Sequence, residues 1–322
     1  MKRDTLALHV GVKTDPVEYR YSYAWLFKLM AEEGVFHAQL GSFFELYQLP
    51  DDYFVQLKNE AAACGVTISS IFTAHRELGG FFRFEHPAWA EVTRRNYRRL
   101  IQIAALLQVR CVGSNAGAVL RDQMHHKQEG MQRYLEFMHE MQAYAHQCGV
   151  TCLTIEPMSC LAEPPTLPAE LHAVAQTLLD YHRQHPDSTA TVGYCTDVSH
   201  GHADRDGQVQ WDNMQLLAES LPYLREVHLK NTDAIFNATF GFSAEERARG
   251  IVDIPAVVEL LQNQAAKIPV PEIVGYLEIN GPKFGRDYTD FKLEPMLRES
   301  LRYLREAFTV TPQPAHLPAG GA

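Results

Sequence analysis

The stretch GVTCLTIEP, residues 149–157, contains the two signals that decide the fold. Gly149 follows a segment of helical period, and glycine readily adopts the left-handed conformation that ends a helix. A short apolar run comes next and ends at Glu156, as a buried strand does. Gly34 and Gly65 also stand between a helical segment and a strand-like run. The sequence therefore predicts a regular alternation of helices and strands.

This alternation extends over almost the whole chain. Strands are expected over residues 6–12, 35–40, 66–73, 109–113, 151–156, 190–196, 226–229 and 273–279. Helices are expected over residues 23–33, 53–63, 89–107, 131–147, 167–183, 211–221, 254–264 and 290–308. Eight strands alternating with helices imply parallel pairing, and the number eight favours a closed (β/α)8 barrel over an open sheet. We predict one α/β barrel domain over residues 1–310 and a flexible C-terminal tail over 311–322.

Composition and charge exclude several classes of function. The 322 residues are 46% hydrophobic and 21% charged, which is typical of a folded enzyme. A net charge of −10 disfavours nucleic-acid binding, and the basic cluster at residues 94–99 is expected to be a solvated helix face. No apolar run is long enough to span a bilayer, so no membrane contact is expected. The six cysteines form no CxxC pair, and we expect a cytoplasmic protein.

Four successive strand candidates end in side chains that can bind a metal ion. They are Glu156, Asp197, His228 and Glu278. Taken singly, each is more simply a surface carboxylate or a core histidine. In a (β/α)8 barrel, however, the carboxyl ends of the strands meet at one mouth, where three carboxylates would repel one another without a cation. Carboxylates with one imidazole suit Mn²⁺, Mg²⁺, Co²⁺ or Zn²⁺, so we predict one bound divalent ion.

The order of these residues also resembles a known family. The series Glu, Asp-x-x-His, His, Glu and the turn at Gly250 to Ile254 look like the xylose isomerase-like TIM barrels, the sugar phosphate isomerase/epimerase superfamily. The resemblance covers residues 6–308. It implies that Glu156, Asp197, His228 and Glu278 bind the metal ion, with Mn²⁺ as the expected ion, and that His200 contacts the substrate. The extra histidines of the AP endonuclease branch are missing from this chain.

Further polar residues follow the strands. Lys230 lies two residues beyond His228, so a strand would project both to the same side. It is expected to bind a substrate carboxylate, phosphate or oxyanion; the alternative is a solvated surface lysine. His75, after the third strand, is a further substrate-binding candidate. The nearby pair Phe81-Phe82 either closes over the ligand or packs on the barrel rim.

The resemblance implies an enzyme with a metal-stabilised enediolate and with Glu156 and Glu278 as the acid/base pair. We predict a metal-dependent isomerase or epimerase of a small sugar or sugar derivative. One alternative is a lyase, a dehydratase or decarboxylase that acts on a sugar acid or keto-acid through the same metal site. A minor alternative is a sugar-binding barrel without catalysis. The expected partner is a small carbohydrate, and a homo-oligomer remains an open alternative.

Overall fold

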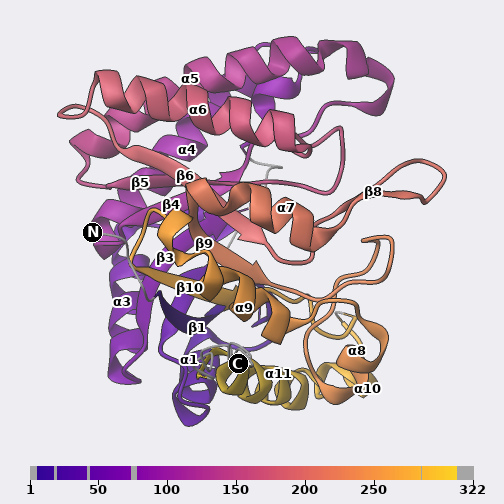
Figure 1. Ribbon diagram of the computed structural model, residues 1–322. Helices are drawn as coiled ribbons and strands as arrows, with labels where there is room; N and C mark the ends of the chain where they lie inside the picture. The colour runs from indigo at the N-terminus through magenta and orange to yellow at the C-terminus, as the bar shows by residue number, and fades with distance from the viewer. Residues whose placement is uncertain (1–5, 18–19, 42–43, 74–77, 284, 310–322) are drawn as a thin grey trace, which may run out of the picture.

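Eight parallel strands close into a barrel. The computed structural model describes residues 6–17, 20–41, 44–73, 78–283 and 285–309. Around the barrel the strands follow the order β1-β10-β9-β6-β5-β4-β3-β2 (Figure 1). Their bounds are β1 (Ala7–Lys13), β2 (His37–Leu40), β3 (Thr67–Thr73), β4 (Cys111–Asn115), β5 (Cys152–Glu156), β6 (Thr191–Asp197), β9 (Leu224–Leu229) and β10 (Glu272–Leu277). The predicted (β/α)8 barrel is confirmed.

Helices surround the barrel as the periodicity predicts. The long ones are α1 (Tyr23–Glu32), α3 (Asp51–Ala63), α4 (Ala88–Leu107), α5 (Lys127–Gln147), α6 (Pro168–Gln184), α7 (Asn213–Ser220), α9 (Ile254–Asn263) and α11 (Leu293–Thr309). Short helices are α2 (Phe44–Gln48), α8 (Ala244–Arg249) and α10 (Asp287–Asp290). Gly34, Gly65 and Gly149 follow α1, α3 and α5 with φ of 69°, 72° and 81°, the conformation expected of glycines that end helices.

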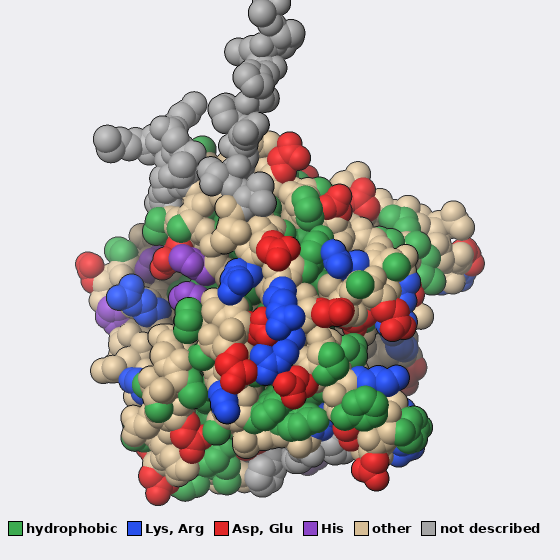
Figure 2. Space-filling view, turned by 90° about the horizontal axis from the view of Figure 1, so that it is seen from below, with side chains coloured by type: hydrophobic (Ala, Val, Ile, Leu, Met, Phe, Trp, Pro, Cys, Tyr) green, Lys and Arg blue, Asp and Glu red, His purple; other side chains and the backbone are tan. Residues whose placement is uncertain are grey.

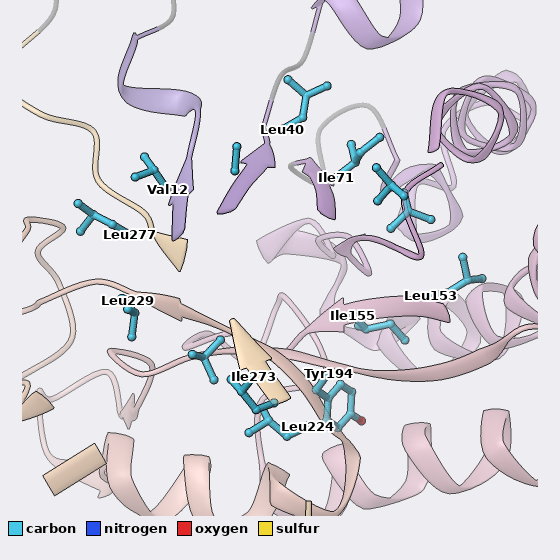
Figure 3. Close-up of a cluster of buried hydrophobic side chains, with 14 of the residues drawn as sticks. Val12, Leu40, Ile71, Leu153, Ile155, Tyr194, Leu224, Leu229, Ile273 and Leu277 are labelled. Carbon is cyan, nitrogen blue, oxygen red and sulfur yellow. The ribbon is translucent and has the colours of Figure 1, made fainter. Parts of the chain in front are cut away.

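The alternation of side chains along each strand separates the core from the chemistry. In β5, Leu153 and Ile155 are fully buried in the hydrophobic core (Figure 3). The intervening Thr154 donates a hydrogen bond to Glu226 of β9, which shows that it points inside the barrel. Glu156 continues this inward series. Because successive side chains of a strand point to opposite faces, the apolar residues pack against the helices and the polar ones point into the barrel.

Three segments at the carboxyl ends of the strands are additions to the eightfold repeat. A loop over residues 157–167 follows β5. An antiparallel hairpin of β7 (His202–Ala203) and β8 (Val209–Trp211) follows β6 and stands away from the barrel (Figure 1). A longer segment that includes α8 follows β9. The prediction of a helix over residues 211–221 was wrong at its start, because Trp211 belongs to β8. The helix α7 begins at Asn213, after the capping box formed by Asp212.

The outer surface agrees with the expectations from charge and hydropathy. Arg94 pairs with Glu91 and Glu140, and Arg99 pairs with Asp51, so the basic cluster of α4 is an ion-paired helix face. Basic and acidic side chains are also interspersed on the face that lies below the view of Figure 1 (Figure 2). Within the described ranges, no helix has the length and apolar character needed to cross a membrane.

Ion pairs fasten the last helix to the first. The carboxylate of Glu33, the C-cap of α1, accepts hydrogen bonds from Arg298 (2.8 Å) and Arg302 (2.7 Å) of α11. Its side chain is 6% exposed. Hydrogen bonds from Arg302, with those from Arg298, hold the pKa of Glu33 below its ordinary value of 4.5 despite the burial. This carboxylate therefore links α1 and α11, the first and last helices around the barrel.

We expect Glu33→Gln to lower the free energy of unfolding at pH 7 by about 1–2 kcal/mol, since Arg302 remains partly exposed. Because the folded-state pKa is lowered, the contribution is complete above pH 4.5 and disappears as pH falls through the folded-state value. Urea unfolding of both proteins at several pH values measures this difference. The exposed Glu259→Gln on α9 is the control. Equal stability of Glu33→Gln and the parent protein at pH 7 would contradict a stabilising role of the Glu33 ion pairs.

Candidate functional site

The four predicted metal ligands meet at the mouth of the barrel. Glu156, Asp197, His228 and Glu278 each offer one ligand atom, and these atoms lie within 4.8 Å of one another. They come from β5, β6, β9 and the residue after β10, which are consecutive strands around the barrel. Exposure is 4% for Glu156, 1% for Asp197 and 0% for His228. The cluster is therefore formed by strand ends and is almost closed to water.

His228 lies between the two glutamates. Its Nδ1 is 2.9 Å from Oε1 of Glu156 and 3.2 Å from Oε2 of Glu278. Burial alone would lower the pKa of His228, but Cys195, Glu278 and Glu156 outweigh it and raise the pKa well above its ordinary value. Without a metal ion the ring is therefore an imidazolium that partly neutralises the two carboxylates.

A chain of buried hydrogen bonds orients the ring of His228. Its Nε2 is 2.8 Å from Oε1 of Gln39, which is completely buried. The amide nitrogen of Gln39 donates to Ser70 (3.2 Å) and to the carboxylate of Glu226 (3.4 Å). Because this leaves only the amide oxygen for the ring, Nε2 must carry a proton and Nδ1 faces the cluster. Such a partner on the far nitrogen is usual for histidines that bind metal ions.

Each carboxylate of the cluster has one oxygen held by a protein donor. The donors are the amide of Asn115 for Glu156 (2.6 Å), the backbone N–H of Ser199 for Asp197 (2.8 Å) and the ammonium of Lys13 for Glu278 (2.7 Å). The second oxygens face the centre, where Oδ2 of Asp197 pairs with Lys230 and Oε2 of Glu278 lies 3.2 Å from Nδ1 of His228. Three carboxylate oxygens and one imidazole nitrogen are a donor set that fits one divalent cation.

Two lysines also enter the cluster. The Nζ of Lys230 lies 2.5 Å from Oδ2 of Asp197 and 3.7 Å from Oε2 of Glu278. Lys13, at the end of β1, pairs with Asp15 and Glu278. Burial alone would lower the pKa of each lysine, but the nearby carboxylates raise both pKa values above the ordinary range. Both side chains are therefore charged.

Charge balance favours a cation beside these lysines. Asp15, Glu156, Asp197 and Glu278 carry four negative charges, and Lys13 and Lys230 supply two positive charges. One divalent ion with a neutral His228 makes the set electrically neutral, whereas the imidazolium alone leaves one negative charge uncompensated. Lys230 also lies 3.3 Å from Nε2 of His200.

The structure places the other predicted residues as follows. His200 lies beside the cluster, with Nε2 3.4 Å from Oδ2 of Asp197 and Nδ1 2.8 Å from the carbonyl oxygen of Pro157. His75 and the expected tail over residues 311–322 lie outside the described residues. Phe81 and Phe82 are buried, and Phe81 stacks on Phe137 of α5 at 4.4 Å. Of the two interpretations of this pair, the structure supports packing on the rim.

Sequence reasoning missed three residues that hold the site together. Lys13 was not considered because the first strand was expected to end at Val12. Its inward direction follows from alternation once the strand is extended by one residue. Asn115 and Gln39 were not predicted as site residues. A polar residue at or next to the end of a strand was the available signal for all three.

Binding of Mn²⁺ should raise the melting temperature and release about one proton, because Nδ1 of His228 must lose its proton to become a ligand. The apparent affinity should then increase up to about tenfold per pH unit below the raised pKa of His228. Calorimetric titration in two buffers of different ionisation heats counts the protons released. Tight binding without proton release would show that His228 is not a ligand.

Replacement of Lys13 by Met should destabilise the metal-free chain by about 3–5 kcal/mol, because it leaves Asp15 and Glu278 as close, unpaired carboxylates. Saturating Mn²⁺ should recover part of this loss, since the ion would replace the missing positive charge. Chemical unfolding with and without Mn²⁺ measures both effects. The control is Lys28→Met, whose side chain is 76% exposed. Equal stability of the two variants would show that Lys13 does not balance the cluster.

Comparison with known proteins agrees with this geometry. A family model described as xylose isomerase-like TIM barrel matches residues 28–307. The chain belongs to this family. The resemblance inferred from the strand-end residues is thereby confirmed. A search of curated proteins finds no match.

Solved structures share the fold of this family member at low sequence identity. A putative xylose isomerase from Rhodospirillum rubrum is 17% identical, with a TM-score of 0.73 over 93% of this chain and 99% of that one. D-psicose 3-epimerase from Clostridium cellulolyticum H10 is 15% identical, with a TM-score of 0.66 over 93% and 99%. A 3-keto-D-glucoside 4-epimerase from E. coli is 14% identical, with a TM-score of 0.61 over the same shares. These likenesses establish the common barrel architecture.

Proposed function

We propose that this chain is a divalent-metal-dependent isomerase or epimerase of a sugar or sugar derivative. The observation that carries the proposal is the convergence of three carboxylate oxygens and Nδ1 of His228 within 4.8 Å, with Glu156 and Glu278 on two sides of that nitrogen. Two similar structures are sugar 3- and 4-epimerases by name, and they share this barrel. We propose Glu156, Asp197, His228 and Glu278 as the ligands, with Mn²⁺ as the ion.

A bound divalent ion would supply a Lewis acid that polarises a substrate carbonyl. The protein residues would then move the proton on the neighbouring carbon. Glu156 and Glu278 are the candidate acid and base, because both are buried and flank the same point. A substrate carbon between them would present its proton to one carboxylate and receive a proton from the other.

The two glutamates are not equivalent. Glu156 accepts a hydrogen bond from the neutral amide of Asn115, whereas Glu278 contacts the ammonium of Lys13. Burial alone would raise the pKa of Glu278, but His228, Lys13 and Lys230 lower it well below the ordinary value. We therefore assign proton removal to Glu156 and expect Glu278 to act as the weaker base.

Lys230 and His200 support the oxygen atoms of the substrate. Nζ of Lys230 and Nε2 of His200 lie 3.3 Å apart and both face Asp197. A cationic group that is already in position stabilises an oxygen on which negative charge develops. The same pair could protonate a departing hydroxide, which is the observation that favours a dehydratase as the second candidate.

Incubation of the Mn²⁺-loaded chain in D₂O with D-fructose, D-psicose, D-tagatose and D-gluconate tests the proposal. An isomerase or epimerase incorporates solvent deuterium at carbon without change in the rest of the formula, whereas a dehydratase product has lost water. Mass spectrometry and proton NMR separate these outcomes. Saturable binding without exchange or mass loss would instead favour a non-catalytic sugar-binding protein.

Glu278→Gln should reduce turnover by about 10²–10⁴-fold if the carboxylate takes part in proton transfer, because the amide preserves the shape and removes the base. The matched control is Glu272→Gln at the start of β10, the strand that leads to Glu278; the side chain of Glu272 is 66% exposed. Turnover and Mn²⁺ affinity are measured together, so that loss of the ion is distinguished from loss of the base. A fully active Glu278→Gln protein would remove Glu278 from the mechanism.

A further inference from the structure

The segment after β9 begins with a loop that is closed at its base. The base is an antiparallel bridge between Asn231 and Phe240, with backbone hydrogen bonds of 2.8 Å and 3.2 Å. Lys230, whose Nζ pairs with Asp197, directly precedes this bridge. Residues 232–239 therefore leave the barrel mouth and return to it, and the start of the loop lies at the metal cluster.

The backbone in the middle of this loop is strained. Phe236 has a φ of 62°, in the left-handed region that bulky residues rarely adopt. Its backbone N–H donates to the carbonyl oxygen of Asp233 (3.1 Å), whose carboxylate accepts hydrogen bonds from the N–H groups of Ile235 (3.2 Å) and Asn237 (2.8 Å). These hydrogen bonds hold Phe236 in an unfavourable conformation. Strain of this kind persists only where the surrounding structure imposes it, and it is common at functional sites.

The ring of Phe236 lies against the backbone of Gly201. A Cβ atom at residue 201 would lie 2.2 Å from Cζ of Phe236 and 2.5 Å from both of its Cε atoms, so the ring in this position leaves no room for a side chain there. Gly201 is not among the glycines with a positive φ, so its own backbone conformation does not require glycine. The close approach of the Phe236 ring is therefore the structural reason for glycine at this position.

This contact connects the two segments that carry Lys230 and His200. Gly201 directly follows His200 in the chain, and the loop of Phe236 directly follows Lys230. Nζ of Lys230 and Nε2 of His200 lie 3.3 Å apart, and both are close to Oδ2 of Asp197. The Phe236 ring therefore joins, outside the cluster, the two segments whose side chains meet within it.

We infer that Phe236 is a positioning residue that holds His200 in place relative to Lys230. The inference rests on the proposed function, in which this pair supports the oxygen atoms of the substrate. Such donors are effective when their geometry is fixed before charge develops on the oxygen. The strained backbone of Phe236 is explained if it keeps the ring pressed against Gly201. In this role the ring acts through His200 and does not need to touch the substrate.

Hydrogen exchange in the metal-free chain tests the contact independently of catalysis. Phe236→Ala and Gly201→Ala should each speed exchange of the backbone amides of residues 200–202 about fivefold, because each removes the packing of the ring on this segment. Ile235→Ala is the matched control, since Ile235 precedes Phe236 in the same loop and is 48% exposed. Mass spectrometry of peptides from this segment measures the exchange. Unchanged exchange in Phe236→Ala and Gly201→Ala would overturn the inference.

Turnover tests whether the contact acts on the reaction. On a sugar that the Mn²⁺-loaded chain converts, Phe236→Ala should lower kcat about tenfold and change KM and Mn²⁺ affinity less than about twofold, because His200 and Lys230 act on charge that develops in the transition state. Gly201→Ala should have the same effect, since its methyl group displaces the ring. The double variant should also lose about tenfold, because both changes break one contact. A loss of about a hundredfold in the double variant, or full activity of Phe236→Ala, would overturn the inference.

Two further variants separate positioning from stability. Glycine adopts a φ of 62° without strain, so Phe236→Gly should melt at a higher temperature than Phe236→Ala and yet lose kcat equally. Phe236→Met, with a flexible side chain of similar length, should recover most of kcat. Values of kcat that simply follow melting temperature would show a structural role alone and overturn the inference. Faster exchange in Phe236→Ala, with no turnover of any sugar by the parent chain, would contradict the proposed function while supporting Phe236 as the residue that positions His200.

Discussion

Compensation of buried charge is the constraint on which the mouth of this barrel depends. An isolated carboxylate loses several kcal/mol of solvation when it is buried, so a group of them persists only with close positive partners. Lys13 and Lys230 balance half of the charge of Asp15, Glu156, Asp197 and Glu278. The remaining two charges match one divalent ion. The lysines thus reduce the net negative charge of the cluster to an amount that a single divalent ion would balance.

The same constraint explains the polar column beneath the cluster. A barrel interior is usually filled with branched apolar side chains, but here Gln39, Thr154 and Glu226 occupy a middle layer. Burial raises the pKa of Glu226 even though several hydrogen bonds oppose the shift. Such a layer contributes little to stability compared with an apolar one. Its effect is to fix the amide of Gln39 and, through it, the ring of His228.

Sequence patterns predict the barrel well because they report burial. The strands of a parallel barrel are apolar where they meet the helices, so β5 and β6 are recognisable, and their terminal Glu156 and Asp197 mark the mouth. The support of the site is harder to predict. Lys13 and Asn115 lie far from Glu278 and Glu156 in sequence. Closure of the barrel brings β1 next to β10, and parallel pairing of successive strands brings β4 next to β5. The position of a residue along its own strand does not reveal which residue lies beside it on the adjacent strand.

The β7–β8 hairpin shows that the structure of the added segments is also hard to predict from the sequence. Asp206-Gly207 is a turn signal, and Gly207 has a φ of 75°, as such a turn requires. The flanking strands β7 and β8 are too short and too polar to stand out by periodicity. His200, just before β7, contacts the segment after β5 through the carbonyl oxygen of Pro157. The proposed metal ligands therefore lie at the ends of rigid strands, whereas the added segments follow β5, β6 and β9. His200 belongs to both groups, since one ring nitrogen joins the loops and the other faces Asp197. A shift of either loop would move this ring, so the loops after β5 and β6 are connected to Asp197 through His200.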